Sequence, residues 1–477
     1  MQEKENILNI YEETSYNFFR KKQDYLKISP TSGSAINLNS SGGQITHEVN
    51  STESYIFMPE AYGVLTYSIT KADNTDLGDA NITLEHNWPM RIFSQLIVDI
   101  GGFQKTYTNP GEYDTILKTI MYSKLMNETG EEYGWIPDTG SGSYVEDIPL
   151  AILGNGETAA TENKTTKGQY NKIVKRLNSR NINTGYIKRR ENYNKVTTAP
   201  KRGGVIKLSL SPLIGFLDWQ KITKGIPFKF HWTRKNNDKE IFFGASGLNP
   251  KLTIESFEIM IPTISLSPSA EAAFLKSLDK DITVSYIERE TISPIRIESS
   301  VYTWNIANIS NMPHAVFVVF KHNANLPSLR ENNSKFISSL SQQAEVAEVA
   351  PDSAIPARQE VIIKELQLRL NQVHYPNDRI RINATKQDFN KAHKMYEDIC
   401  VRFGVLPSLS KQDFQTLYPI FCFDLTAQDE HLVKTGVNIQ LDIEKSSNEP
   451  LTAYALILVQ TKKVIRVNSG NQMSRVE

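Results

Sequence analysis

Cysteine is scarce in this chain. Only Cys400 and Cys422 occur among 477 residues. Two cysteines cannot build a disulfide framework in a chain of this length, so a reducing compartment is the expected environment. Cys422 lies in the apolar run PIFCF, where we expect a small core residue. The first residues, MQEKENILNIYEETSYNFF, lack the basic start and apolar core of a secretory signal, so we expect a protein that is not secreted.

The chain also has no net charge and no long apolar run. Lys and Arg together number 53, and Asp and Glu together also number 53. This balance gives no general attraction to nucleic acid or to membranes. No apolar run reaches the roughly 18 residues that a membrane-spanning helix needs. The length of 477 residues is enough for two or three domains, and the 39% of hydrophobic residues is ordinary for a globular protein with real cores.

Motifs that would carry chemistry are absent from the sequence. It contains no G-x-x-x-x-G-K-[ST], no H-E-x-x-H and no C-x-x-C. The eight histidines are scattered, and a surface or core position explains each of them better than metal ligation. His231, for example, alternates with Phe230 and Trp232, which places it on the outward face of a strand. The sequence therefore predicts no catalytic residue, no cofactor and no metal site.

What the sequence does contain is the alternation of β-strands. Three strand-like runs stand close together near the end of the chain, at Tyr418–Leu425, Val437–Glu444 and Thr452–Val467. In the middle run, apolar and polar residues alternate strictly, which is the period of a half-buried strand. We expect Ile439 and Leu441 to face a core. These runs are typical of the closing strands of an antiparallel β-sandwich.

A similar block occurs roughly two hundred residues earlier. It consists of Leu208–Trp219, Ile226–Arg234 and Leu252–Pro262, a Pro-containing strand, an alternating strand and a long apolar strand in the same order. We expect Phe230 and Trp232 of the alternating strand to lie in a core. The same three kinds of strand occur twice in the same order, so the chain is expected to contain two copies of one structural unit.

A strand followed by a helix also occurs twice. Helical stripes run through Glu112–Met126 and Lys386–Phe403, and each follows a strand segment, QLIVD from Gln95 and QLRLN from Gln367. Both helices carry a Met-Tyr pair. Together with the repeated closing strands, this pattern predicts two copies of one β-sandwich, each with a helix in a long loop.

The remaining stretches set the predicted boundaries. Residues 1–26 are weakly amphipathic and favour a packed or frayed terminal arm over a helix, and residues 29–44 are typical of a linker. Residues 136–204 and 338–357 indicate long loops. The predicted order is an N-terminal arm and linker at 1–44, a first sandwich at 45–266, a linker helix at 267–280, a second sandwich at 281–468 and a C-terminal tail at 469–477.

One stretch of this neutral chain is strongly basic. Between Lys164 and Arg202, twelve Lys and Arg residues stand against Glu191 alone, a net charge of +11. A solvated loop is one interpretation. The other is contact with an acidic neighbouring subunit or with nucleic acid, and the interleaved tyrosines favour the subunit. The candidate contact residues are Lys175, Arg176, Arg180, Lys188, Arg189 and Arg190.

Taken together, the chain resembles the double jelly-roll major capsid proteins, the hexon-like proteins of Polinton/Maverick elements, adintoviruses and related eukaryotic DNA viruses. The resemblance covers most of residues 45–467 and depends on loose family patterns. These are YGVLTYSITKADNTDL, RIFSQLIVDIGG, GWIPD, the LSLSPLIGFLDW and IPFKFHWTR pair, PKLTIESFEIMIPTISLSPS, FCFDLTAQDE and VNIQLDIE. The basic loop and the Ala/Glu-rich loop at 338–357 depart from the family core.

The resemblance implies an all-β fold of two tandem eight-stranded antiparallel jelly rolls. It implies a structural subunit whose homotrimers form pseudo-hexagonal capsomers of an icosahedral shell. The implied partners are further copies of the chain, penton and minor capsid proteins, and packaged DNA as an alternative for the basic loop, with no small-molecule substrate. The implied location is the virion capsid, after synthesis in the cytoplasm or nucleus of a host cell.

Two functions from other classes remain as alternatives. A glycan-acting amidase can also pair two eight-stranded jelly rolls, but it needs a cleft with convergent carboxylates and is usually secreted. A carbohydrate-binding module expects exposed aromatic residues on loops. Four of the five tryptophans, Trp88, Trp219, Trp232 and Trp304, instead stand in or beside strand-like runs.

Overall fold

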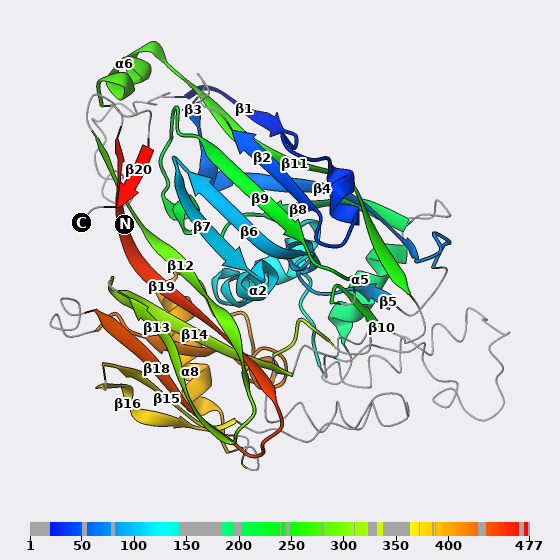
Figure 1. The fold of residues 1–477 in the computed structure, drawn as a ribbon, viewed down its shortest axis with the longest axis vertical. Helices are drawn as coiled ribbons and strands as arrows, with labels where there is room; N and C mark the ends of the chain where they lie inside the picture. Colours follow the sequence, from blue (N-terminus) through cyan, green and yellow to red (C-terminus); the bar gives the residue numbers. More distant parts are fainter. Residues whose placement is uncertain are drawn as a thin grey trace, which may run out of the picture.

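The protein folds into two β-sandwiches that lie side by side and share a buried junction (Figure 1). The computed structural model describes residues 20–49, 55–77, 82–140, 142, 183–194, 202–238, 240–244, 249–277, 281–309, 311–322, 332–336, 363–371, 373–383, 386, 388–427, 436–466 and 472–475.

Two antiparallel sheets make up the first sandwich. One sheet has the order β1 (Arg20–Ile28), β11 (Pro250–Leu266), β4 (Tyr62–Lys71) and β8 (Arg202–Ser209), and β3 (Tyr55–Ile56) pairs with the end of β11. The facing sheet has the order β2 (Gln44–Val49), β9 (Phe228–Arg234), β6 (Phe93–Ile100) and β7 (Phe103–Thr108).

The second sandwich repeats this plan. One sheet has the order β12 (Ile282–Ile297), β19 (Leu451–Arg466), β14 (Pro313–His322) and β17 (Phe421–Asp424), and β20 (Gln472–Arg475) pairs with the end of β19. The facing sheet has the order β13 (Val301–Ile309), β18 (Val437–Lys445), β15 (Ile363–Leu370) and β16 (Val373–Arg381).

The two halves share one topology. When the eight main strands of each sandwich are numbered along the chain, both halves have one sheet in the order 1-8-3-6 and one in the order 2-7-4-5. This is a jelly roll, the double-sheet form of two Greek keys. In both halves a helix follows the fifth strand, α2 (Pro110–Met121) in the first and α8 (Asn390–Arg402) in the second. The predicted pair of jelly rolls, each with a helix in a loop, is confirmed.

Shorter elements fill the connections. The α-helices are α1 (Trp88–Arg91), α3 (Lys124–Thr129), α5 (Thr184–Asn194), α6 (Pro268–Ser277) and α9 (Lys411–Thr416). The 3-10 helices are η2 (Ala35–Asn39), η3 (Met58–Glu60), η4 (Gly130–Tyr133) and η6 (Gly215–Asp218), and β5 (Ile82–Leu84) pairs with β10 (Phe242–Gly244). In chain order, helix α6 connects β11 of the first roll to β12 of the second, where a linker helix is predicted, and it lies at the far end of the first roll (Figure 1). Within the described residues, no helix is long and apolar enough to cross a membrane.

The alternating residues face the cores as predicted. Phe230 is 1% exposed, and Trp232, Ile439 and Leu441 are fully buried. The Trp232 ring lies 4.7 Å from that of Phe93, measured between centroids. Because successive strand residues point to opposite faces, the register of β9 places Phe230 and Trp232 inside the first sandwich, and the register of β18 places Ile439 and Leu441 inside the second. Cys422 is likewise buried, in β17.

Three predictions about local structure are wrong. The supposed N-terminal arm contains β1, which pairs with β11, so the first jelly roll begins before residue 45. The supposed C-terminal tail contains β20. The run Leu208–Trp219 is not one strand, because β8 ends at Ser209 and η6 follows. Strands β1 and β20 each pair with a neighbour on one side only, and such strands need no apolar alternation to form.

Candidate functional site: a charged junction between the jelly rolls

The six basic residues predicted as contact residues differ in position and exposure in the structure. Lys175, Arg176 and Arg180 lie outside the described residues. Lys188 and Arg190 lie on α5, where Lys188 is exposed and Arg190 is half-buried. Their role in subunit or nucleic-acid contact stays a prediction. Arg189 of the same helix is only 5% exposed, so it does not present its charge to a partner.

Arg189 instead binds a buried carboxylate of its own chain. Its Nη2 lies 2.7 Å from Oδ1 of Asp138, and its Nη1 donates to the backbone oxygen of Ile136 at 2.6 Å. Burial would raise the pKa of Asp138, but the Arg189 charge outweighs it, and the pKa is lower than usual. The prediction that Arg189 contacts a partner is therefore corrected: a buried carboxylate requires this cation.

Asp138 also connects α5 to both jelly rolls. Its Oδ1 accepts a hydrogen bond from Nδ2 of Asn183 at 2.7 Å. Its Oδ2 accepts from Nδ2 of Asn332 at 2.9 Å and from the Tyr418 hydroxyl at 3.3 Å. Asn332 and Tyr418 belong to the second roll. One carboxylate therefore holds three segments that are far apart in sequence.

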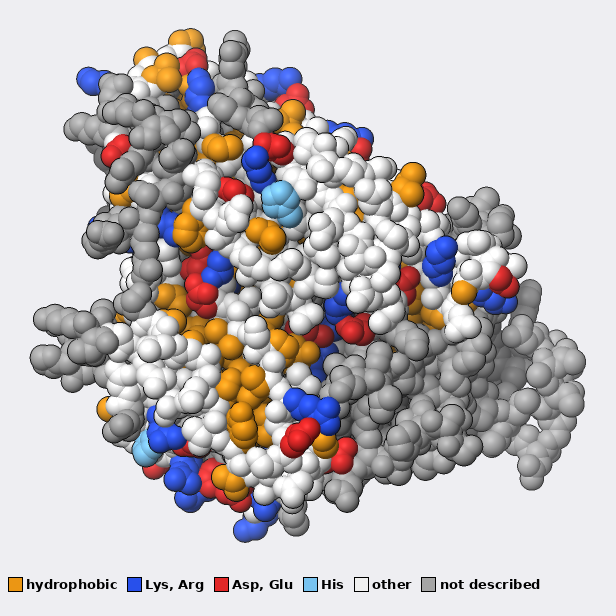
Figure 2. Space-filling view, in the orientation of Figure 1, with side chains coloured by type: hydrophobic (Ala, Val, Ile, Leu, Met, Phe, Trp, Pro, Cys, Tyr) orange, Lys and Arg blue, Asp and Glu red, His pale blue; other side chains and the backbone are white. Residues whose placement is uncertain are grey.

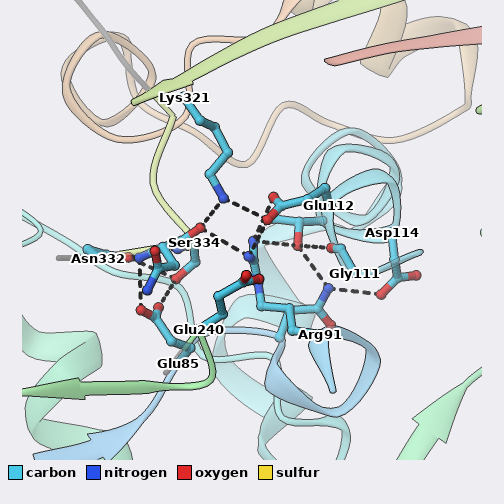
Figure 3. Close-up of polar contacts among 12 residues, drawn as sticks. Glu85, Arg91, Gly111, Glu112, Asp114, Glu240, Lys321, Asn332 and Ser334 are labelled. Atoms are coloured by element: carbon cyan, nitrogen blue, oxygen red, sulfur yellow. Dashed lines mark hydrogen bonds and ion pairs between the residues drawn. The ribbon is translucent and has the colours of Figure 1, made fainter. Parts of the chain in front are cut away.

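A second buried ion-pair group lies beside it (Figure 3). Glu112, at the start of α2, forms two ion pairs through its Oε1 atom. Nη1 of Arg91 lies 2.8 Å from this oxygen, and Nζ of Lys321, from β14 of the second roll, lies 2.7 Å from it. Burial works against the charged form of Glu112, but the two cations outweigh it and lower its pKa to about 2. Arg91 and Lys321 both donate to the backbone oxygen of Asn333. The two rolls are thus joined by charge-assisted hydrogen bonds.

Glu85, between β5 and α1, extends the junction. Its Oε1 accepts the backbone N–H of Asn333 at 2.8 Å, and its Oε2 contacts the hydroxyl of Ser334. No cation of the described residues forms an ion pair with it. Burial, the largest influence, raises the pKa of Glu85 to about 7.

His86 is the next residue and is fully buried. Its ring lies 4.1 Å from that of Trp135, measured between centroids, and neither ring nitrogen has a hydrogen-bond partner in the described part of the chain. Burial holds the pKa of His86 well below its usual value. Nearby, Lys118 of α2 pairs with Asp114 at 2.7 Å, with both side chains buried. A neutral imidazole therefore packs beside a set of paired charges.

The rolls also meet through a separate group. Nζ of Lys463 donates to the Tyr286 hydroxyl at 2.6 Å and lies 3.0 Å from the ring centroid of Phe103, in the first roll. The Tyr107 hydroxyl, also in the first roll, donates to Glu288 at 3.2 Å. Burial lowers the pKa of Lys463 to about 8, although Glu288 pulls the other way.

The arrangement fastens the two rolls to each other. The charged groups of the junction are engaged with one another, and the described residues include no cluster of His, Cys, Asp or Glu that could hold a metal. A hollow of about 330 Å³ opens beside Arg234 and Lys251 of the first roll and shares no residue with the junction. Sequence reasoning missed the junction because its partners lie up to 280 residues apart. The one sequence signal for this junction was the presence of charged residues within the predicted helix at Glu112–Met126.

Comparison with known proteins agrees with the strand order of the two jelly rolls. A family model described as a double jelly roll-like domain matches residues 186–465. The chain belongs to this double jelly roll-like family. The predicted family resemblance is thus confirmed at the level of the domain. A Polinton, Maverick or adintovirus source is not tested by this match and stays a prediction. No curated protein sequence matches the chain.

Solved structures share the double jelly roll. The Sputnik virophage structure matches with a TM-score of 0.61 and 13% identity, over 98% of this chain and 91% of that one. The mavirus major capsid protein matches with a TM-score of 0.53 and 10% identity, over 98% and 93%. The Faustovirus major capsid protein gives 0.52 and 8%, over 95% and 92%. At these identities the likeness is one of fold.

Proposed function

We propose that this protein is a major capsid protein, the structural subunit of an icosahedral DNA-virus shell. One observation carries the proposal: two jelly rolls of the same strand order, fastened by buried ion pairs, match capsid structures over nearly the whole chain. A shell subunit needs a rigid body with broad contact surfaces. The double jelly roll with its charged junction provides such a body.

The working unit that we propose is a homotrimer. One chain presents two similar walls, and three chains close a ring of six, which gives a pseudo-hexagonal outline. Closed cyclic symmetry is the usual way in which such surfaces are satisfied, and obligate interfaces typically bury more than about 2,000 Å². In Figure 2, hydrophobic side chains gather on the second roll near its boundary with the first, a surface suited to a neighbouring copy.

The further partners follow from the shell role. They are penton and minor capsid proteins, with the virion as the location. For the basic stretch around α5, we propose contact with an acidic face of a neighbouring subunit, and packaged DNA is the alternative. Exposed Lys188 supports contact outside the chain, whereas Arg189 is committed within it. We also propose that the chain has no catalytic activity, because the junction carboxylates are bound to their own cations and hydrogen-bond donors.

Electron microscopy of the purified protein tests this function. We expect trimers with a pseudo-hexagonal outline, which form flat or curved lattices as the concentration rises. Light scattering at micromolar concentration and physiological salt should give the mass of three chains. Only monomers in both measurements would contradict the proposal. Hydrolase turnover that one Asp or Glu substitution abolishes would favour the amidase instead.

A further inference from the structure

The contact between Glu85 and residues 332–336 depends on whether the Glu85 carboxyl group is protonated. Glu85 belongs to the first roll and is fully buried, while residues 332–336 lie between β14 and β15 of the second. Oε1 of Glu85 accepts the backbone N–H of Asn333, and Oε2 contacts the Ser334 hydroxyl. Both oxygens therefore face the second roll, as Figure 3 shows.

The orientation of the Asn332 amide is fixed by its other neighbours. Its Nδ2 lies 2.9 Å from Oδ2 of Asp138 and 2.8 Å from the backbone oxygen of Gly142. Both are acceptors, since Asp138 is held ionised by Arg189. Oδ1 of Asn332 must therefore face the other way, toward Ser334. It lies 3.1 Å from the Ser334 backbone nitrogen and 2.9 Å from Oγ of Ser334.

The Ser334 hydroxyl has one proton and lies between two oxygens that can accept it, Oε2 of Glu85 and Oδ1 of Asn332. If Glu85 is ionised, Oε2 of Glu85 and Oδ1 of Asn332 are both acceptors, and the hydroxyl can donate to only one of them. The other oxygen then faces Oγ without a proton between them. A proton on Glu85 removes this conflict: Oε2 donates to Oγ of Ser334, and Ser334 donates to Asn332. Every donor then has an acceptor, as buried polar groups require.

We propose that Glu85 is a neutral carboxylic acid in the assembled junction, and that loss of its proton loosens residues 332–336 of the second roll from the first. The junction thus carries a proton-dependent fastener. This inference is independent of the capsid function, because it concerns only contacts within one chain.

The charged groups that act most strongly on Glu85 are Arg91, Asp138 and Arg189. Arg91 of α1 and Arg189 of α5 favour the anion, whereas Asp138 and above all burial favour the neutral acid. Burial prevails, and the pKa of Glu85 rises from 4.5 to about 7. A raised pKa means that the folded state holds the proton more tightly than the unfolded state. The stabilisation is therefore fully present below about pH 4.5 and is lost as the pH rises through about 7.

Hydrogen exchange of the full-length protein tests the proposal. Exchange of peptides that contain Asn333 and Ser334 is measured at about pH 6 and about pH 8.5 and corrected for the intrinsic rate. With the pKa of Glu85 near 4.5 in the opened state and near 7 in the folded state, local opening should increase roughly tenfold between the two pH values. Glu85→Gln reproduces the neutral acid, because its amide donates to Ser334 and its oxygen accepts from Asn333. This variant should show less than about a twofold change.

Glu255→Gln is the matched control, since Glu255 is exposed on β11, and it should behave as the parent does. An equal pH dependence in the parent and in Glu85→Gln would overturn the proposal. Infrared spectroscopy of the parent keeps the test independent of the variant's folding. A buried carboxylic acid gives a C=O band at about pH 6 that disappears as the pH rises, and its absence at that pH would equally overturn the proposal.

Discussion

Replacement of Arg189 by Met removes the cation of a buried pair while keeping much of the side-chain volume. The guanidinium donates to Asp138 at 2.7 Å and to the Ile136 backbone oxygen at 2.6 Å. After the change, Asp138 still accepts from Asn183, Asn332 and Tyr418 but has no ion-pair partner. The variant therefore leaves an uncompensated buried charge.

The expected loss follows from that unpaired charge. Removal of one partner of a buried pair costs about 3–5 kcal/mol. For a unit of about 200 residues, 1 kcal/mol corresponds to roughly 2–4 °C, so the melting temperature should fall by about 10 °C. Lys188→Met is the control on the same helix. Lys188 is exposed, and its loss should change the melting temperature by less than about 2 °C.

Calorimetry of the two variants and the parent measures this difference. Proteolysis adds a local measurement, because weaker attachment of α5 should expose the segment around residues 183–194 to a protease. The double variant Arg189→Met with Asp138→Asn should recover part of the loss, since it removes the stranded charge. If Arg189→Met and Lys188→Met melt alike, then Arg189 is not the buried partner that the structure shows.

Three further predictions concern other buried groups. Trp232→Ala should cost about 3–5 kcal/mol by denaturant unfolding, because it empties a fully buried site against Phe93; a variant within about 1 kcal/mol of the parent would place Trp232 outside the core. His86 has a folded pKa below 6.5, so its contribution to stability is lost as the pH falls below about 6.5; His86→Phe should lose less stability than the parent between about pH 7 and pH 5, and equal losses would exclude this role. Lys321→Met leaves Glu112 with Arg91 alone and should lower the melting temperature at neutral pH, whereas no change would show that Arg91 suffices.

The sequence predicted those parts of the fold that have a strict period. Apolar and polar residues alternate in β18 from Val437 to Glu444, and their burial alternates with them. The repeat of closing strands and helices then revealed the duplication. Strand β1 was missed because its sequence, RKKQDYLKI, is polar and belongs to an edge, where half of the strand's hydrogen-bonding groups and most of its side chains face solvent.

The junction was hidden from the sequence for a different reason. Arg189 stands among eleven other basic residues of the same stretch, and nothing local distinguishes it from Lys188. Its partner Asp138 lies 51 positions away. Lys321 and Glu112 are separated by 209 positions. Pairing at such distances is decided by the tertiary arrangement of the two rolls, on which residue periodicity carries no information.

The junction has a consequence for synthesis on the ribosome. Strands β1 to β11 end at Leu266, but Lys321, Asn332 and Ser334 follow later in the chain. Until these residues emerge, Glu112 lacks one cation and Glu85 faces no partner, which is costly for buried carboxyl groups. The first half of the nascent chain therefore cannot complete its buried charged contacts before the second half has been synthesised. Expressed alone, it should need chaperones or aggregate, and supplying the second half as a separate chain should rescue it.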